Sequence, residues 1–155
     1  MRPLVTWIVL FSLIASTPVA AGGNSWNRLR YSGGTVEAKV NPFDWNTTLT
    51  VTPDGLSLVF SGRKTVRIQA SDVTGLSYGQ EARRRVADLV ALSVIATPLV
   101  LFGLLHQSQV HFVGIEFRGE DGKPGAVLLE ADKGNYRAIL QVLGSVTGQP
   151  VKNAP

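Results

Sequence analysis

Short runs of alternating apolar and polar side chains dominate the middle of this 155-residue chain. A period of two is typical of strands with one buried face, and turn residues separate the runs. Pro53-Asp54-Gly55 is typical of a tight turn, because proline presets one dihedral angle and glycine accepts a positive φ. The pattern therefore predicts antiparallel hairpins, with strands over residues 35–40, 48–52, 56–60, 65–68, 73–78, 110–117 and 126–130.

A different spacing appears near the C-terminus, where apolar residues recur every three or four positions. The residues that would share one helix face are Tyr136, Ile139, Leu140, Leu143 and Val146. Gly148 followed by Pro150 is typical of a helix end, because glycine tolerates the left-handed terminal conformation and proline prevents continuation. The pattern predicts one amphipathic C-terminal helix and a loose tail over residues 149–155.

The run from Val66 to Tyr78 combines a strand, an acidic turn at Ser71-Asp72 and a second strand. The run Val113-Gly114-Ile115-Glu116-Phe117 opens a later hairpin, which the final helix follows. Together these parts resemble bacterial pleckstrin-homology-like and GRAM-like domains, over most of residues 35–146. The resemblance implies an α+β fold, in which a curved antiparallel sheet is capped by the C-terminal amphipathic helix.

The first residues have the three parts of an export signal. Met1-Arg2-Pro3 supplies a positive start, residues 4–15 are almost wholly apolar, and Val19-Ala20-Ala21 supplies small residues for cleavage. We expect a signal peptide over residues 1–21, with an uncleaved anchor as the alternative. Glycine, serine and asparagine are frequent over residues 22–34, which predicts a flexible tether before a single domain at 35–148.

An uncharged apolar run from Leu89 to Leu105 follows the basic step Arg83-Arg84-Arg85. It predicts an apolar helical insertion over residues 86–105, close to the length of about 17 to 25 residues that crosses a bilayer. A helical hairpin that turns at Thr97-Pro98 is favoured, because the chain then returns to the side that it left. A single span is the second interpretation, although it would separate the strands on either side. The third is an apolar element buried in the domain or in a dimer.

In the favoured interpretation the insertion enters lipid, and basic side chains contact anionic head groups. The predicted insertion residues are Leu89, Val90, Leu92, Val94, Ile95, Leu99, Val100, Leu101, Phe102, Leu104 and Leu105. The predicted head-group contacts are Arg83, Arg84, Arg85, Arg63, Lys64 and Arg67, which would form one positive surface if the two groups lie side by side.

The composition of the chain argues against several kinds of partner and site. The net charge of +4 is scattered along the chain, whereas nucleic-acid binders concentrate basic residues on one face, so we expect no nucleic-acid partner. The absence of cysteine excludes disulfides, a thiol nucleophile and cysteine metal ligands. His106 and His111 have no acidic residue at ligand spacing, so we expect no metal and no cofactor. Either histidine would gain charge as the pH falls toward about 6.5.

Gly75-Leu76-Ser77-Tyr78-Gly79 matches the pattern of a hydrolase nucleophile elbow, with Asp88 and then His106 or His111 downstream. That elbow belongs to a large parallel sheet with a helix directly after the serine turn. The pattern here predicts antiparallel strands, so we expect no catalytic residue and no enzymatic activity.

The sequence as a whole favours an exported, membrane-associated binding or scaffolding module of the periplasm or cell envelope, with membrane lipid as its partner. The alternatives are a single-pass membrane protein, an envelope structural protein that binds a protein partner or its own copy, and, remotely, a serine hydrolase. Trp26 and Trp45 are expected to be core or interface aromatics, and Asn46-Thr47-Thr48 fits the glycosylation acceptor pattern.

Overall fold

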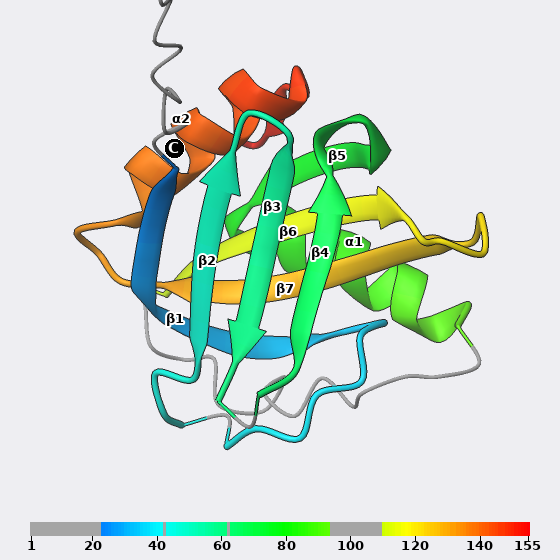
Figure 1. The fold of residues 1–155 in the computed structure, drawn as a ribbon, viewed down its shortest axis with the longest axis horizontal. Coiled ribbons are helices and arrows are strands. Elements are labelled where there is room, and N and C mark those ends of the chain that lie inside the picture. The colour runs from blue at the N-terminus through cyan, green and yellow to red at the C-terminus, as the bar shows by residue number, and fades with distance from the viewer. Residues whose placement is uncertain (1–22, 42, 62, 94–109) are drawn as a thin grey trace, which may run out of the picture.

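The fold, seen in a computed structural model, is a strongly bent mixed sheet with one helix on its outer face and another against its core (Figure 1). The structure describes residues 23–41, 43–61, 63–93 and 110–155. Within them the elements are β1 (Asn24–Gly34), β2 (Thr47–Thr52), β3 (Gly55–Phe60), β4 (Thr65–Gln69), the short 3-10 helix η1 (Ala70–Asp72), β5 (Val73–Tyr78), α1 (Gly79–Ala91), β6 (His111–Arg118), β7 (Pro124–Ala131), α2 (Tyr136–Thr147) and β8 (Val151–Lys152).

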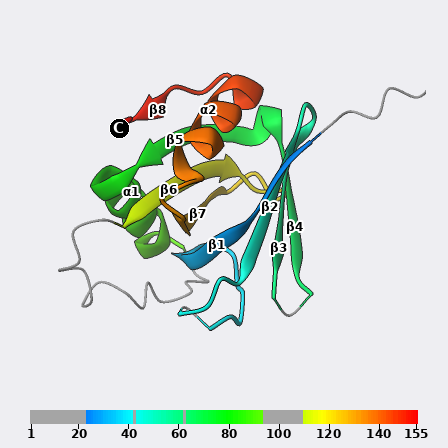
Figure 2. The same ribbon diagram turned by 90° about the vertical axis from the view of Figure 1, so that its left-hand side faces the viewer.

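The strand order is β4-β3-β2-β1-β7-β6-β5-β8, and the pairs are antiparallel apart from the parallel pair of β5 and β8. β1 changes partner along its length, pairing with β2 up to Leu29 and with β7 from Leu29 onward. Figure 2 shows how this bend turns the β2–β4 half across the β5–β7 half. The α+β class and the strands predicted from alternation, except the one over residues 35–40, are confirmed, whereas the sheet is mixed and not wholly antiparallel.

The main core fills the concave side of the bent sheet and the inner face of α2. Its members include Leu29 from β1, Leu58 from β3 and Ile115 from β6, and all three side chains are fully buried. From α2, the residues Tyr136, Ile139, Leu140 and Leu143 enter this core, which is the face that the helical spacing predicts. The helix ends where Gly148 adopts a left-handed φ of 70°.

A second, smaller core lies on the outer face of β6 and β7, beneath α1. Ala82 and Val86 of the helix are fully buried there, against Phe112, Ala126 and Leu128 of the two strands. The two cores separate along β6 because alternate side chains of a strand point to opposite faces. Helix α1 is therefore part of the folded domain for at least its first two turns.

Three predictions are corrected by the structure at the ends of the domain. Residues 24–34 are not a tether but the central strand β1, because Leu29 and Tyr31 point into the core between glycine, serine and asparagine neighbours. Residues 35–40 form no strand, although Val36 and Ala38 are buried as their alternation predicts. The tail is not wholly loose, because Val151 and Lys152 pair with β5 as β8.

Helix α1 approaches the sheet most closely over Gly114 of β6. A Cβ atom at this position would lie 2.5 Å from Ser77 Oγ and 3.0 Å from the Cβ of Ala82. Ser77 is itself fully buried, and its hydroxyl has no hydrogen-bond partner among the described residues. The absence of a side chain at Gly114 is therefore what allows helix and sheet to pack.

We predict that Gly114→Ala lowers the free energy of unfolding by about 1–3 kcal/mol, the usual cost of overpacking. Urea unfolding would measure the change. The double variant Ser77→Ala/Gly114→Ala should recover part of the loss, because it removes the nearest clashing atom. Ser77→Ala alone serves as the control and should be neutral or stabilising, since it removes a buried hydroxyl that lacks a partner. An unchanged stability of Gly114→Ala would contradict the close packing.

Candidate functional site

Two segments meet at one end of the molecule, which we call the loop end: the β1–β2 connection and the β3–β4 turn. Figures 1 and 2 both show the connection and the turn side by side at the bottom of the sheet. The Lys64 ammonium donates a hydrogen bond to the backbone oxygen of Glu37, which ties the turn to the connection. A cavity of about 520 Å³ is lined by Val36 and by Leu92, which places the end of α1 beside the first residues of the connection.

Three of the four exposed large apolar side chains of the described residues lie at the loop end. Phe43 is 62% exposed and Trp45 is 40% exposed on the connection, while Leu92 is 81% exposed at the end of α1. Val59, 41% exposed, is next to the β3–β4 turn, where it pairs with Thr48 and Thr65. Apolar side chains scattered singly need no explanation, but their collection at one end marks a surface that contacts something apolar.

The turn that presents the two aromatic residues is braced by its own polar side chains. Asn41 donates through Nδ2 to Asp44 at 2.7 Å and accepts the backbone N–H of Phe43 at 3.1 Å. Asn46, which is 3% exposed, donates to the backbone oxygen of Asn41 at 2.7 Å and accepts the N–H of Tyr31 at 2.9 Å. Both ends of the Asn46 amide are engaged, so the folded chain does not offer it for glycosylation.

Trp45 is held in place from beneath by two arginines of β1. The guanidinium carbon of Arg30 lies 4.2 Å from the indole centroid, and that of Arg28 lies 5.6 Å away. Arg30 also pairs with Glu130 at 2.9 Å, and Arg28 pairs with Asp132 at 3.1 Å. These cations are balanced by carboxylates, so they orient the indole without leaving a strong net charge around it.

The basic residues predicted to contact head groups divide among three places. Arg63 and Lys64 are exposed at the loop end, joined there by the exposed Lys39 of the connection. Arg67 lies on β4 and lines a separate groove. Arg83 lies over the ring of Phe112, 5.5 Å from its centroid, on the outer face of the sheet. The sequence therefore grouped residues that belong to different surfaces.

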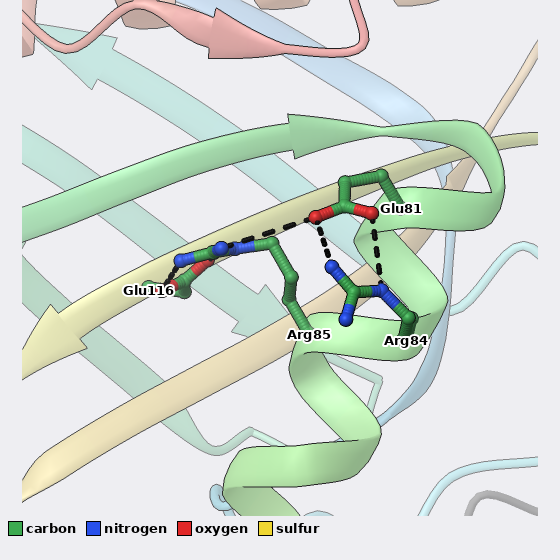
Figure 3. A network of polar contacts seen from close by, with 4 residues as sticks. All are labelled: Glu81, Arg84, Arg85 and Glu116. Atoms are coloured by element: carbon green, nitrogen blue, oxygen red, sulfur yellow. Dashed lines mark hydrogen bonds and ion pairs between the residues drawn. The ribbon is translucent and has the colours of Figure 1, made fainter.

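Arg84 and Arg85 form a network with two glutamates (Figure 3). Arg84 donates to Glu81 at 2.7 Å, while Arg85 binds both carboxylate oxygens of Glu116 and lies 3.9 Å from Glu81. The hydrogen bond from Arg84 lowers the pKa of Glu81, and the hydrogen bond to Glu116 raises the pKa of Arg85. The positive charges of Arg84 and Arg85 are thus already matched within the protein, and their contact with head groups stays a prediction.

The predicted insertion begins earlier than expected and is partly built into the domain. Helix α1 starts at Gly79 rather than at residue 86, and Leu89 and Val90 pack against the smaller core. Among the described helices none is both long and apolar enough to cross a membrane. Outside the described residues lie the other predicted insertion positions, namely Val94, Ile95, Leu99, Val100, Leu101, Phe102, Leu104 and Leu105.

Ser77 does not have the geometry of a hydrolase nucleophile. A strand precedes it and a helix follows at Gly79, as an elbow requires, but its side chain is fully buried beneath α1. His111 lies on the other face of the sheet, because Ser77 pairs with Gly114, three positions along β6. His106 lies outside the described residues, and within the described chain no group of acidic and histidine side chains is arranged to hold a metal ion.

His111 instead joins α2 to the sheet in a stack of three rings. Its ring lies 3.8 Å from that of Tyr136, centroid to centroid, and Nδ1 is 2.7 Å from the hydroxyl of Tyr78. Burial lowers the pKa of His111, and the nearby cations Lys133 and Arg137 lower it further. The lowered pKa favours the neutral form of the imidazole in the folded state.

Known proteins offer a likeness of fold only. The sequence matches no known protein family and no curated protein. The structure resembles a chain in the "Structure of the Spt16D Pob3N heterodimer", with a TM-score of 0.50 and 11% identity. The match covers 85% of this chain and 54% of that chain, so this chain spans about half of its length. The protein therefore has a pleckstrin-homology-like fold, in agreement with the resemblance found in the sequence.

The sequence analysis did not single out Phe43, and it placed Trp45 only as a core or interface aromatic. Two aromatics within a short stretch of asparagine, aspartate and proline were the available signal, because such a stretch is a turn and turns lie on the surface.

We predict that Arg85→Ala lowers the free energy of unfolding by about 1–3 kcal/mol, because it leaves the largely buried carboxylate of Glu116 without its partner. Arg84→Ala is the matched control on the same helix. Its side chain is 65% exposed, so it should cost no more than about 0.5 kcal/mol. Urea unfolding of both variants measures the difference, and equal losses would show that the Glu116 pair is not structurally important.

We predict that His111 makes the fold less stable in mild acid. Because its pKa is lowered by folding, the unfolded chain binds the proton first. The contribution of neutral His111 to the free energy of unfolding is complete above about pH 6.5, near the pKa of histidine in an unfolded chain. It falls as the pH drops from there toward the lower pKa of His111 in the folded state. Unfolding free energies measured across this window should decline less in His111→Phe, which keeps a stacking ring but cannot titrate. The same decline in both proteins would assign the effect to other groups.

Proposed function

We propose that this protein is an exported binding module that lies with its loop end on an anionic membrane surface. The observation that carries the proposal is the exposure of Phe43 and Trp45 on the β1–β2 connection, to which the exposed Lys64 of the β3–β4 turn is hydrogen-bonded. Apolar side chains gain free energy by entering the outer part of a bilayer, and cations gain it from anionic head groups. The two kinds of side chain support attachment to the same surface.

The aromatic residues suit this role because their turn is rigid. Indole rings favour the boundary between head groups and acyl chains, where the ring is shielded and its N–H stays in a polar layer. The hydrogen bonds of Asn41 and Asn46 fix the turn before it meets lipid, so little conformational entropy is lost on binding. A flexible loop with the same residues would bind more weakly.

The apolar segment that follows α1 supports the same orientation. Ser93 precedes the segment beside the cavity that Val36 and Leu92 line, and Val110 follows it against the smaller core that also contacts Leu89 and Val90. Both flanks thus adjoin one folded unit, because α1 packs on β6 and β7 and Val110 leads directly into β6. This arrangement favours our hairpin interpretation over a single span, because a span would place its flanks on opposite sides of the bilayer.

The contribution of the arginines is revised accordingly. Of the residues that the sequence assigned to head-group contact, Arg63 and Lys64 lie at the loop end, where Lys39 joins them. Each basic residue close to an anionic surface contributes roughly 1 kcal/mol, so this group alone gives weak, salt-sensitive attachment. The apolar side chains supply the rest.

An exposed apolar surface can also bind a protein, so a protein partner or a second copy is the competing function. The vesicle experiment below separates the two classes. The proposed location is the periplasm or cell envelope, and it rests on the predicted signal at residues 1–21, which lie outside the described residues. Fractionation with protease protection of a tag at Pro155 tests it, because export predicts digestion of the tag from outside the cytoplasmic membrane.

We predict that the full chain sediments with phosphatidylserine-containing vesicles and that Arg63→Glu/Lys64→Glu lowers this partitioning by about tenfold or more. The control is Lys133→Glu/Lys152→Glu, which makes the same charge change at exposed positions on other segments and should bind like the parent chain. Phe43→Ser/Leu92→Ser should weaken binding to anionic and neutral vesicles alike, because it removes apolar contacts.

Equal loss of vesicle binding in the two charge-reversed variants would show that binding depends on overall charge. The loop end would then not be the surface that binds the membrane. Absence of vesicle binding, combined with a defined oligomer in solution that Phe43→Ser/Leu92→Ser disrupts, would replace lipid by a protein partner.

A further inference from the structure

The sheet ends at β4 on one side, and this edge is not closed by the fold. The opposite edge, along β5, is covered in part by β8, whose two residues pair with Leu76 and Ser77. β4 has β3 as its neighbour on one side, and Figure 1 shows its other side facing away from the β1–β3 strands. An uncovered strand edge presents backbone donors and acceptors in a row, which makes it a template for a further strand.

The hydrogen bonds near both ends of β4 establish which of its backbone groups face outward. Phe60 donates to Lys64 at one end of the hairpin, and Ala70 donates to Asp54 at the other. Antiparallel pairs alternate between bonded and non-bonded, so the bonded pairs between these ends contain Val66 and Ile68. The N–H and C=O groups of the intervening residues, Thr65, Arg67 and Gln69, point away from β3. Within the described chain no backbone or side-chain hydrogen bond takes up these outward groups.

A groove of about 300 Å³ runs beside this edge. All five residues of β4 line it, and its other wall is the end of β6 with the residues that follow, including Phe117 and Arg118. The groove therefore gives room beside the strand, with an apolar ring on its far wall. Asp72 and Glu120 also line it, so the lining is mixed in charge.

We propose that β4 is a docking edge, to which an extended segment of another protein adds as an antiparallel strand with an acidic side chain opposite Arg67. Arg67 is the middle residue of β4, is exposed, and belongs to an outward-facing position. Opposite charges on facing residues of neighbouring strands stabilise the pair, and like charges destabilise it. A symmetric pairing of two copies centred here would place Arg67 against Arg67, which disfavours a second copy as the occupant.

This docking edge is separate from the proposed membrane surface and does not depend on it. Backbone bonds to Thr65, Arg67 and Gln69 would supply affinity, and the side chain opposite Arg67 would supply selectivity. The partner class is thus defined by chemistry: an extended segment with β-branched residues around one acidic residue.

The test uses the full chain and two short synthetic peptides of alternating valine and threonine, one with a central glutamate and one with a central lysine. Each is titrated to millimolar concentration while backbone amide resonances are followed by NMR. We expect the glutamate peptide to shift the amides of Thr65, Arg67 and Gln69 more than those of Val66 and Ile68. The lysine peptide should bind about three- to tenfold more weakly.

Arg67→Pro removes one outward N–H without breaking a bond to β3, and proline is tolerated at such edge positions. It should abolish the shifts, whereas Arg63→Glu/Lys64→Glu should retain them. Arg67→Glu keeps the backbone N–H and should reverse the preference, so that the lysine peptide binds more tightly than the glutamate peptide. If Arg67→Pro does not fold, this variant tests the proposal in its place. Shifts that persist in Arg67→Pro, a preference unchanged in Arg67→Glu, or no shift with either peptide would each overturn the proposal.

Discussion

The architecture depends on the change of partner at Leu29 in β1. Before this residue the strand is bonded to β2, and after it the strand is bonded to β7, so one strand belongs to both halves of the sheet. The pairing register shifts on either side of the change, which bends the strand, and Gly34 follows where a Cβ would lie 2.2 Å from the backbone oxygen of Ala126. A straight strand with a side chain there could not join the halves at this angle.

The bend gives the protein two working surfaces with different chemistry. On the outside of the β6–β7 half, α1 covers the sheet, and its arginines are used to fasten Glu116 and Glu81. At the bottom of the β2–β4 half, turns and connections end without a covering helix, and apolar residues remain in solvent. Arg84 and Arg85 of α1 are thus paired with carboxylates, whereas Arg63 and Lys64 are exposed at the loop end, which also carries Phe43 and Trp45.

Sequence reasoning reached the strands and the final helix because their periods of two and of three to four are local. It missed β1, since Gly33, Gly34 and Ser32 give the composition of a linker, and only pairing with β2 and β7 makes these residues a strand. It also placed Arg85 at a lipid surface, because nothing local reveals that Glu116, on a strand beyond the apolar run, is its partner. Phe43 was not singled out, and Trp45 was placed only as a core or interface aromatic, because burial is a property of the assembled fold.

The position of β1 has a consequence for how the chain folds. Its residues are bonded to residues about one hundred positions later, as in the pair of Arg30 with Glu130, which contact both through the ladder and through an ion pair. The sheet therefore cannot close until nearly the whole chain is available, and contacts of such long sequence separation slow folding. When the chain is synthesised from its N-terminus, β1 is made early and its partner β7 late, so β1 lacks this neighbour for most of synthesis. That delay favours a chain that is still unfolded when synthesis ends, which is the state that the proposed export through a narrow channel would require.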